Sequence, residues 1–179
     1  TTAVLFTFTM ETAIRSIQPW LGPTRGGSQV RVVGSFQVPS QQLSCRFGGI
    51  ETPANLITPT ELLCVTPFVQ SVGIVGLSVS SNGVDYTPTP ASFEFVPPVR
   101  SYEVAPSRGP TAGGIHVVVT GSQFSPRAAA LHYLRCRFDA SVAVATYLSE
   151  TAVACVSPSH AAEVVRVDVR CDGGWFSNR

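Results

Sequence analysis

The 179-residue sequence contains no lysine, and only 13% of its residues are charged. Its 12 basic residues are all arginine, and together with 11 acidic residues they give a formal net charge of +1. This balance offers no electrostatic basis for binding nucleic acid or an anionic membrane. No apolar stretch approaches the roughly 20 residues that a membrane-spanning helix needs, so we expect no direct membrane insertion in this segment.

Motifs of catalysis and metal binding are also missing. The three histidines, His116, His132 and His160, are scattered, and the sequence has neither a His-x-x-x-His nor a Cys-x-x-Cys spacing, which argues against a zinc site. The run "SPSH" at 157 to 160 places serine near histidine, but in a turn with no orienting carboxylate at hand, which argues against a hydrolase triad. The acidic residues are dispersed and suggest no catalytic pair. We therefore expect no enzymatic activity, no metal and no cofactor.

What the sequence does contain is a repeat. The hexapeptide "GPTRGG" at 22 to 27 returns as "GPTAGG" at 109 to 114, and each precedes a valine-rich, strand-like run. Later segments match in the same order: "LSCRFGG" with "LRCRFDA", "TELLCVTP" with "TAVACVSP", and "GLSVSSNGVDY" with "RVDVRCDGGWF". Short β-branched and aromatic segments separated by turn residues predict an all-β chain of tandem immunoglobulin-like β-sandwiches, each of about 85 to 90 residues.

The repeat predicts the domain boundaries. We expect a first domain over 13–97 and a second over 98–179, with the stiff pair Pro97–Pro98 at the junction. The first domain ends in "ASFEFVPP", where Phe93 and Phe95 share one face of a final strand. The start "AVLFTFTM" has the same aromatic pattern at Phe6 and Phe8, so residues 1–12 are predicted to be the last strand of a preceding repeat. No such strand is found in the second domain before Arg179, so its C-terminal strand is expected to be missing from the sequence.

Four of the five cysteines form two equivalent pairs. Cys45 and Cys64 lie 19 positions apart, as do Cys136 and Cys155, and strand alternation turns all four toward the core. This arrangement predicts one disulfide in each domain; the alternative is two pairs of buried thiols that pack as small apolar groups. Cys171 has no counterpart, because Ser81 occupies its position in the first repeat. It is either a buried, inert thiol or a partner for a cysteine outside this sequence.

The glycine-rich hexapeptides are predicted to be structural turns. Proline presets a turn, and paired glycines allow a positive φ and a close approach of the backbone. Neither hexapeptide continues as a phosphate-binding loop, since no Gly-Lys-Ser/Thr follows. The turn residues are Gly22, Pro23, Gly26 and Gly27 in the first repeat, and Gly109, Pro110, Gly113 and Gly114 in the second.

Other side chains have two interpretations each. Trp20 and Trp175 are candidate contact aromatics that could stack on a sugar, although packing in the core or between domains is the plainer interpretation. The outward arginines Arg46, Arg135 and Arg137 fit a solvated face better than a nucleic-acid patch. The Ser/Thr/Pro-rich stretches at 85–92 and 157–159 are either plain loops or sites of O-linked glycosylation; no Asn-x-Ser/Thr site is present.

Together these residues resemble the IPT/TIG domain, an immunoglobulin-like fold found in plexins and transcription factors. Its pattern "P..G...GG..V.V.G..F", then "C.FG" and "C..P", then a final "F.F/Y" strand, is met over nearly the whole chain; the second repeat departs at Asp139–Ala140, where the first has Gly48–Gly49. The first repeat carries the pattern at Pro19, Gly22, Gly26, Gly27, Val30, Val32, Gly34, Phe36, Cys45, Phe47, Gly48, Cys64, Pro67, Phe93 and Phe95.

The resemblance implies two different settings. In extracellular proteins, tandem IPT/TIG copies with a disulfide form stalks and partner-binding segments. In some intracellular transcription factors, a single copy without a disulfide mediates dimerisation. Repeated cysteine pairs fit the first setting, so we expect a structural or adhesive segment of a large secreted or cell-surface protein, forming a rod-like stalk or filament. The expected partners are other proteins, including neighbouring repeats and further copies of the chain. A ligand-binding receptor ectodomain is the alternative, and an intracellular dimerisation module is less favoured.

Overall fold

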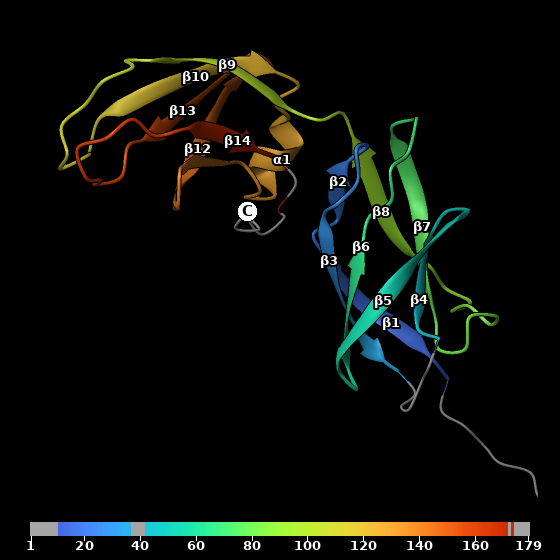
Figure 1. The fold of residues 1–179 in the computed structure, drawn as a ribbon. Coiled ribbons are helices and arrows are strands. Elements are labelled where there is room, and N and C mark those ends of the chain that lie inside the picture. The colour runs from blue at the N-terminus through green and yellow to red at the C-terminus, as the bar shows by residue number, and fades with distance from the viewer. Residues whose placement is uncertain (1–10, 37–41, 172, 174–179) are drawn as a thin grey trace, which may run out of the picture. The chain divides into compact units, whose positions relative to one another are not determined.

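A computed structural model describes residues 11–36, 42–171 and 173 of the chain (Figure 1). The chain divides into two compact units, and its strands form two separate sheets. The proposed last strand of a preceding repeat falls almost wholly outside the described residues, as does Trp175. The prediction of an all-β fold with two sheet-built domains is confirmed.

The sheet of the first repeat has the hydrogen-bonded strand order β1-β3-β6-β5-β4-β7-β8-β2. Strands β1 and β2 follow each other in the chain, joined across the cis peptide Gln18–Pro19, yet stand at opposite ends of this order. The sheet therefore folds over into two layers. The strands are β1 (Ala13–Gln18), β2 (Leu21–Pro23), β3 (Gln29–Ser35), β4 (Ser44–Phe47), β5 (Ile50–Thr58), β6 (Glu61–Val65), β7 (Gly73–Ser80) and β8 (Ala91–Val96).

The second repeat has the order β14-β11-β12-β13-β10-β9. The pairings around the two cysteine-bearing strands are the same as in the first repeat. No counterparts of β2 and β8 are found among the described residues. The strands are β9 (Arg100–Ala105), β10 (His116–Ser122), β11 (Arg135–Phe138), β12 (Ser141–Ser149), β13 (Ala152–Val156) and β14 (Val167–Arg170).

One long strand in each repeat belongs to both layers. The first half of β5 pairs with β4, down to Pro53 opposite Ser44, and its second half pairs with β6, beginning at Ala54 opposite Cys64. Strand β12 does the same between β11 and β13, changing partner between Val144 and Ala145. A strand that switches sheets makes a corner of a β-sandwich.

Each core forms from the inward-facing residues of alternating strands. In β3, Val30 and Val32 are fully buried while Gln29 and Arg31 point outward, the pattern of a sheet with one wet face. The largest buried side chains of the first repeat include Leu21, Phe47, Leu62, Leu77, Phe93 and Phe95. The second core gathers Val117, Val119, Phe124, Leu134, Phe138, Val153 and Val169 around its cysteines.

A short helix interrupts the second repeat and was not predicted. Helix α1 (Pro126–Ala130) lies between β10 and β11. Ser125 caps it by accepting a hydrogen bond from Ala128 N–H, and a proline opens its first turn. The run "SPRAAA" carries both start signals, so the sequence could have shown this helix. In the described part of the chain, no helix has the length and apolar character needed to cross a membrane.

Candidate functional site

A disulfide joins the two layers of each repeat. The structure links Cys45 of β4 to Cys64 of β6, and Cys136 of β11 to Cys155 of β13, with Cα atoms 6.1 and 6.4 Å apart. All four cysteines are buried in the cores. In the strand order, β5 lies between β4 and β6, and β12 lies between β11 and β13. Each disulfide therefore links the two layers directly.

Both glycine-rich hexapeptides form tight turns. Gly26 N–H donates to the carbonyl oxygen of Pro23 at 2.9 Å, and Gly113 N–H to that of Pro110 at 3.0 Å. The two paired glycines in each turn have φ between 71 and 83°, a region that side-chain-bearing residues rarely adopt. A Cβ on Gly113 would also overlap the backbone of Pro158. The glycines thus allow a backbone geometry that other residues rarely adopt.

Cys171 and Trp20, two further candidate residues from the sequence, differ in their burial. Cys171 is buried, follows β14 and packs in the core of the second repeat. Trp20 is 51% exposed, between β1 and β2, while its carbonyl oxygen accepts a hydrogen bond from Glu94 N–H. Trp20 is therefore not a core residue, and a contact role for this ring remains a proposal.

The outward arginines each have a partner within their own repeat. The Arg46 guanidinium lies 3.7 Å from the centre of the Tyr86 ring, and Arg137 donates to Asp168 at 2.9 Å across β11 and β14. Arg135 donates to the carbonyl oxygen of Leu134. Burial raises the pKa of the Tyr86 hydroxyl above its ordinary value, although its hydrogen bond with Ser44 opposes that shift. These contacts indicate a structural role for the three arginines rather than a phosphate-binding surface.

The surroundings of His160 correct one expectation. The sequence suggested no orienting carboxylate beside this histidine, but Glu163 places a carboxylate oxygen 3.3 Å from His160 Nδ1. The nearby Ser157 hydroxyl instead accepts a hydrogen bond from Ile115 N–H at 3.3 Å. The structure thus supplies a histidine–carboxylate pair without directing a serine nucleophile to it. Among the described residues, no group of three or more His, Cys, Asp or Glu side chains comes together as a metal site.

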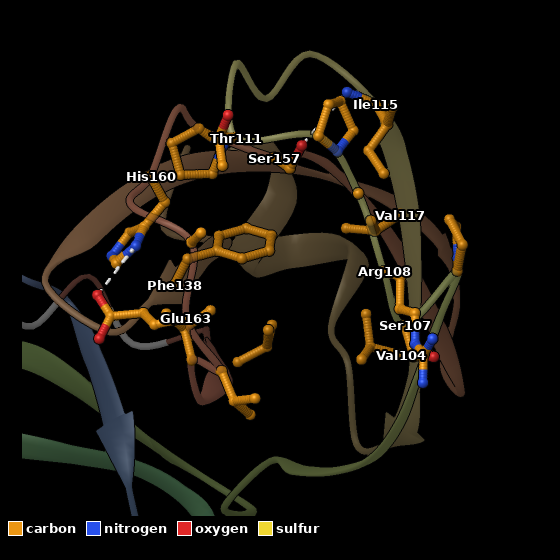
Figure 2. A pocket seen from close by; sticks show the side chains of 18 of the residues that line it. Val104, Ser107, Arg108, Thr111, Ile115, Val117, Phe138, Ser157, His160 and Glu163 are labelled. Atoms are coloured by element: carbon orange, nitrogen blue, oxygen red, sulfur yellow. Dashed lines mark hydrogen bonds and ion pairs between the residues drawn. The ribbon is translucent and has the colours of Figure 1, made fainter.

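A groove of about 490 Å³ opens in the second repeat (Figure 2). Val104, Ile115, Val117, Phe138 and Val167 make its apolar lining. Arg108 and the His160–Glu163 pair add charge. This volume lies within the range of small-molecule pockets, so its size alone does not identify an occupant.

In the first repeat, buried aromatic side chains occupy the position equivalent to this groove. Phe47, the counterpart of Phe138, meets the ring of Phe93 edge-on with the centroids 5.2 Å apart. Phe93 and Phe95 of β8 are 0% and 2% exposed. Burying a phenylalanine fully stabilises a fold by about 1.5–3 kcal/mol, so β8 contributes substantially to the first core.

The sequence holds two signals for this groove, but neither identifies it as a site. The second repeat has no Phe-x-Phe segment, and Arg108 stands where the first repeat has Leu21, a residue 1% exposed. That substitution makes one wall of the groove charged.

Two layered β-units, each with an inter-layer disulfide and a glycine-rich turn, define this chain as a tandem immunoglobulin-like protein. Residues 13–95 and 98–179 each match the family model described as the IPT/TIG domain. The chain therefore belongs to the IPT/TIG family, as its sequence motifs indicated.

Similar proteins include plexins. The chain is 32% identical to human plexin-A3 over 118 residues, which are 61% of this chain and 6% of that protein. It is 31% identical to plexin-2 of Caenorhabditis briggsae over 127 residues, covering 68% of this chain and 7% of that protein. The chain thus spans only a small part of the length of these relatives.

A solved structure of the plexin A4 full extracellular region has the same fold. It aligns with a TM-score of 0.60 and 18% identity, covering 85% of this chain and 13% of the plexin chain. The chain is therefore an IPT/TIG segment that resembles plexin extracellular domains.

Proposed function

We propose that this chain is a non-enzymatic segment of a larger extracellular protein, in which tandem IPT/TIG repeats support and space other domains and contact other proteins. The observation that carries the proposal is the disulfide at the same inter-layer position in both repeats. Such bonds persist in oxidising compartments and are rare in the cytosol.

Similarity to plexins supports the receptor-ectodomain form of this function over the filament form. Human plexin-A3 and plexin-2 of Caenorhabditis briggsae are among the relatives, and the aligned solved structure is that of the plexin A4 extracellular region. The proposed partners are other proteins. The net charge of +1 gives nucleic acid no electrostatic attraction.

A peptide mass map of the full-length protein from its natural source tests the compartment. Trypsin cuts this segment only at arginine, because it contains no lysine. Without reduction, we expect fragment 32–46 joined to 47–100 and fragment 136–137 joined to 138–166; reduction should separate both pairs. The same chain made in a reducing cytosol is the control. Alkylation of all four cysteines without reduction would contradict the extracellular proposal and favour an intracellular dimerisation module.

A further inference from the structure

The first half of β12, residues 141–144, forms an edge of the second repeat that we call the β12 edge. It pairs with β11 on one side, and no strand among the described residues pairs with it on the other. Val142 and Val144 point outward from this edge and are 47% and 67% exposed. Helix α1 contacts β12 but leaves both valine side chains exposed.

The backbone groups of Val142 and Val144 are directed to the open side of the β12 edge. Ala145 N–H donates to the carbonyl oxygen of Leu134 at 3.2 Å, so Ala145 bonds toward the β11 side. Backbone groups alternate in direction along an antiparallel strand, so residues 143 and 141 bond to that side as well. The N–H and C=O groups of Val142 and Val144 therefore point away from β11, where a further strand can pair with them.

The equivalent edge of the first repeat is blocked by two residues. The register places Glu51 and Pro53 of β5 where β12 has Val142 and Val144. The bonding direction is also the same, because Ala54 N–H donates at 3.2 Å to the residue that precedes β4. Pro53 thus has no N–H at the open side, and Glu51 adds a charge there. Proline and charge both discourage an edge strand from pairing with another chain, and the β12 edge has neither.

Charge and symmetry favour a second copy of this chain as the partner of the β12 edge. No residue from 141 to 149 is charged, so a second β12 would place no like charge directly opposite the first. Two antiparallel copies related by a two-fold axis offer each other the same alternating donors and acceptors, as an isologous interface requires. Val142 and Val144 of one copy then lie against the same two valines of the other.

We propose that the second repeat pairs with a second copy of the chain along the β12 edge, which joins the two β14-β11-β12 layers into one continuous sheet. The inference rests on the proposed function as a segment that contacts other proteins, and it names the surface and the partner. An edge of four residues makes a small interface, so the dimer is weak in dilute solution and forms where copies are concentrated.

The arginines beside the β12 edge do not oppose this dimer. Arg135 and Arg137 lie on β11, one strand away from the edge. Across the interface, the arginines of the two β11 strands are three strand spacings apart, roughly 14 Å. That separation exceeds the Debye length of about 8 Å at physiological ionic strength. Within each copy, Arg137 also pairs with Asp168 at 2.9 Å.

Moving the two blocking residues into the second repeat tests the β12 edge. Sedimentation of the 179-residue chain from micromolar to millimolar concentration should show a dimer whose fraction grows with concentration. The variant Val142→Glu/Val144→Pro should dimerise at least tenfold more weakly, because each copy loses one outward donor and gains one charge. Circular dichroism checks that this variant folds, as the first repeat does with the same two residues at these positions. A monomeric wild-type chain, or a dimer that the double substitution leaves intact, would overturn the proposal.

Leu148→Glu is the matched control on the same strand. Leu148 is 52% exposed and lies in the half of β12 that pairs with β13. A charge there should leave the dimer unchanged. Weakening equal to that of Val142→Glu/Val144→Pro would place the contact away from the β12 edge and overturn the proposal.

The reverse exchange does not depend on the folding of an altered second repeat. Glu51→Val/Pro53→Val opens the edge of β5, and should let the chain associate beyond a dimer, since it then carries two such edges. Association no stronger than that of the wild type would overturn the role given to these two positions. A monomeric wild-type chain with both disulfides present in the peptide mass map would overturn the dimer alone and leave the extracellular function standing.

Discussion

Gly34 and Gly121 occupy positions where a side chain would overlap a neighbouring strand. A Cβ on Gly34 would overlap the carbonyl oxygen of Ala13, and one on Gly121 would overlap that of Arg100. Both glycines lie at a register shift between paired strands. The shift between β1 and β3 falls at Ile14/Ser16, and the shift between β9 and β10 falls at Thr120/Gly121. Strands that approach this closely leave no room for a side chain.

We predict that Gly121→Ala destabilises the second repeat by about 1–3 kcal/mol, because the neighbouring strand must move to admit the methyl group. Urea denaturation of the 179-residue chain measures the loss. Gly49→Ala is the matched control, since a Cβ there meets nothing within 4 Å, and it should change stability by less than about 0.5 kcal/mol. An unchanged midpoint for Gly121→Ala would show that β9 adjusts without cost.

At the scale of elements, β5 and β12 each pass from one layer to the other, and the disulfides bridge the strands on either side of them. Strands β11 and β13 both pair with β12, but with different halves of it. The bond between Cys136 and Cys155 therefore closes a loop that contains the whole corner strand. Constraining such a loop lowers the entropy of the unfolded chain.

We predict that the double substitution Cys136→Ala/Cys155→Ala lowers the free energy of unfolding of the second repeat by about 3 kcal/mol, the chain-entropy value for a loop of this length. Chemical denaturation followed by hydrogen exchange in β11 and β13 gives the value for that repeat. The wild-type chain treated with a reductant should lose a similar amount. A stability equal to that of the oxidised wild type would indicate that the core alone holds the layers together.

At the largest scale, the charge balance of the chain argues against nucleic acid as a direct partner of this segment. With 12 arginines against 11 acidic residues, the chain lacks the excess of positive charge from which non-specific DNA affinity arises. The outward arginines Arg46, Arg137 and Arg135 already contact the Tyr86 ring, Asp168 and a backbone oxygen, respectively.

We therefore predict that the 179-residue chain does not retain duplex DNA in a filter-binding assay at about 0.15 M salt, close to physiological ionic strength. A basic DNA-binding domain of similar size serves as the positive control. Salt-dependent retention of DNA by this chain would contradict the prediction and add nucleic acid to its partners.

The repeat, the all-β class and the family all follow from the amino-acid sequence alone. Alternation in segments such as "LSCRFGG" reveals which residues face the core, and a motif repeated at a near-constant interval is visible without coordinates. It also placed the four cysteines on the core side of their strands, since that depends only on the two-residue period of a strand.

Features that depend on contacts between distant segments became visible in the three-dimensional structure. That Arg46 stacks on Tyr86, and that β5 and β12 change layers, follow from loop paths and register, which strand periodicity does not encode. The shape of the groove beside Phe138 likewise depends on residues distant in the chain, from Val104 to Val167.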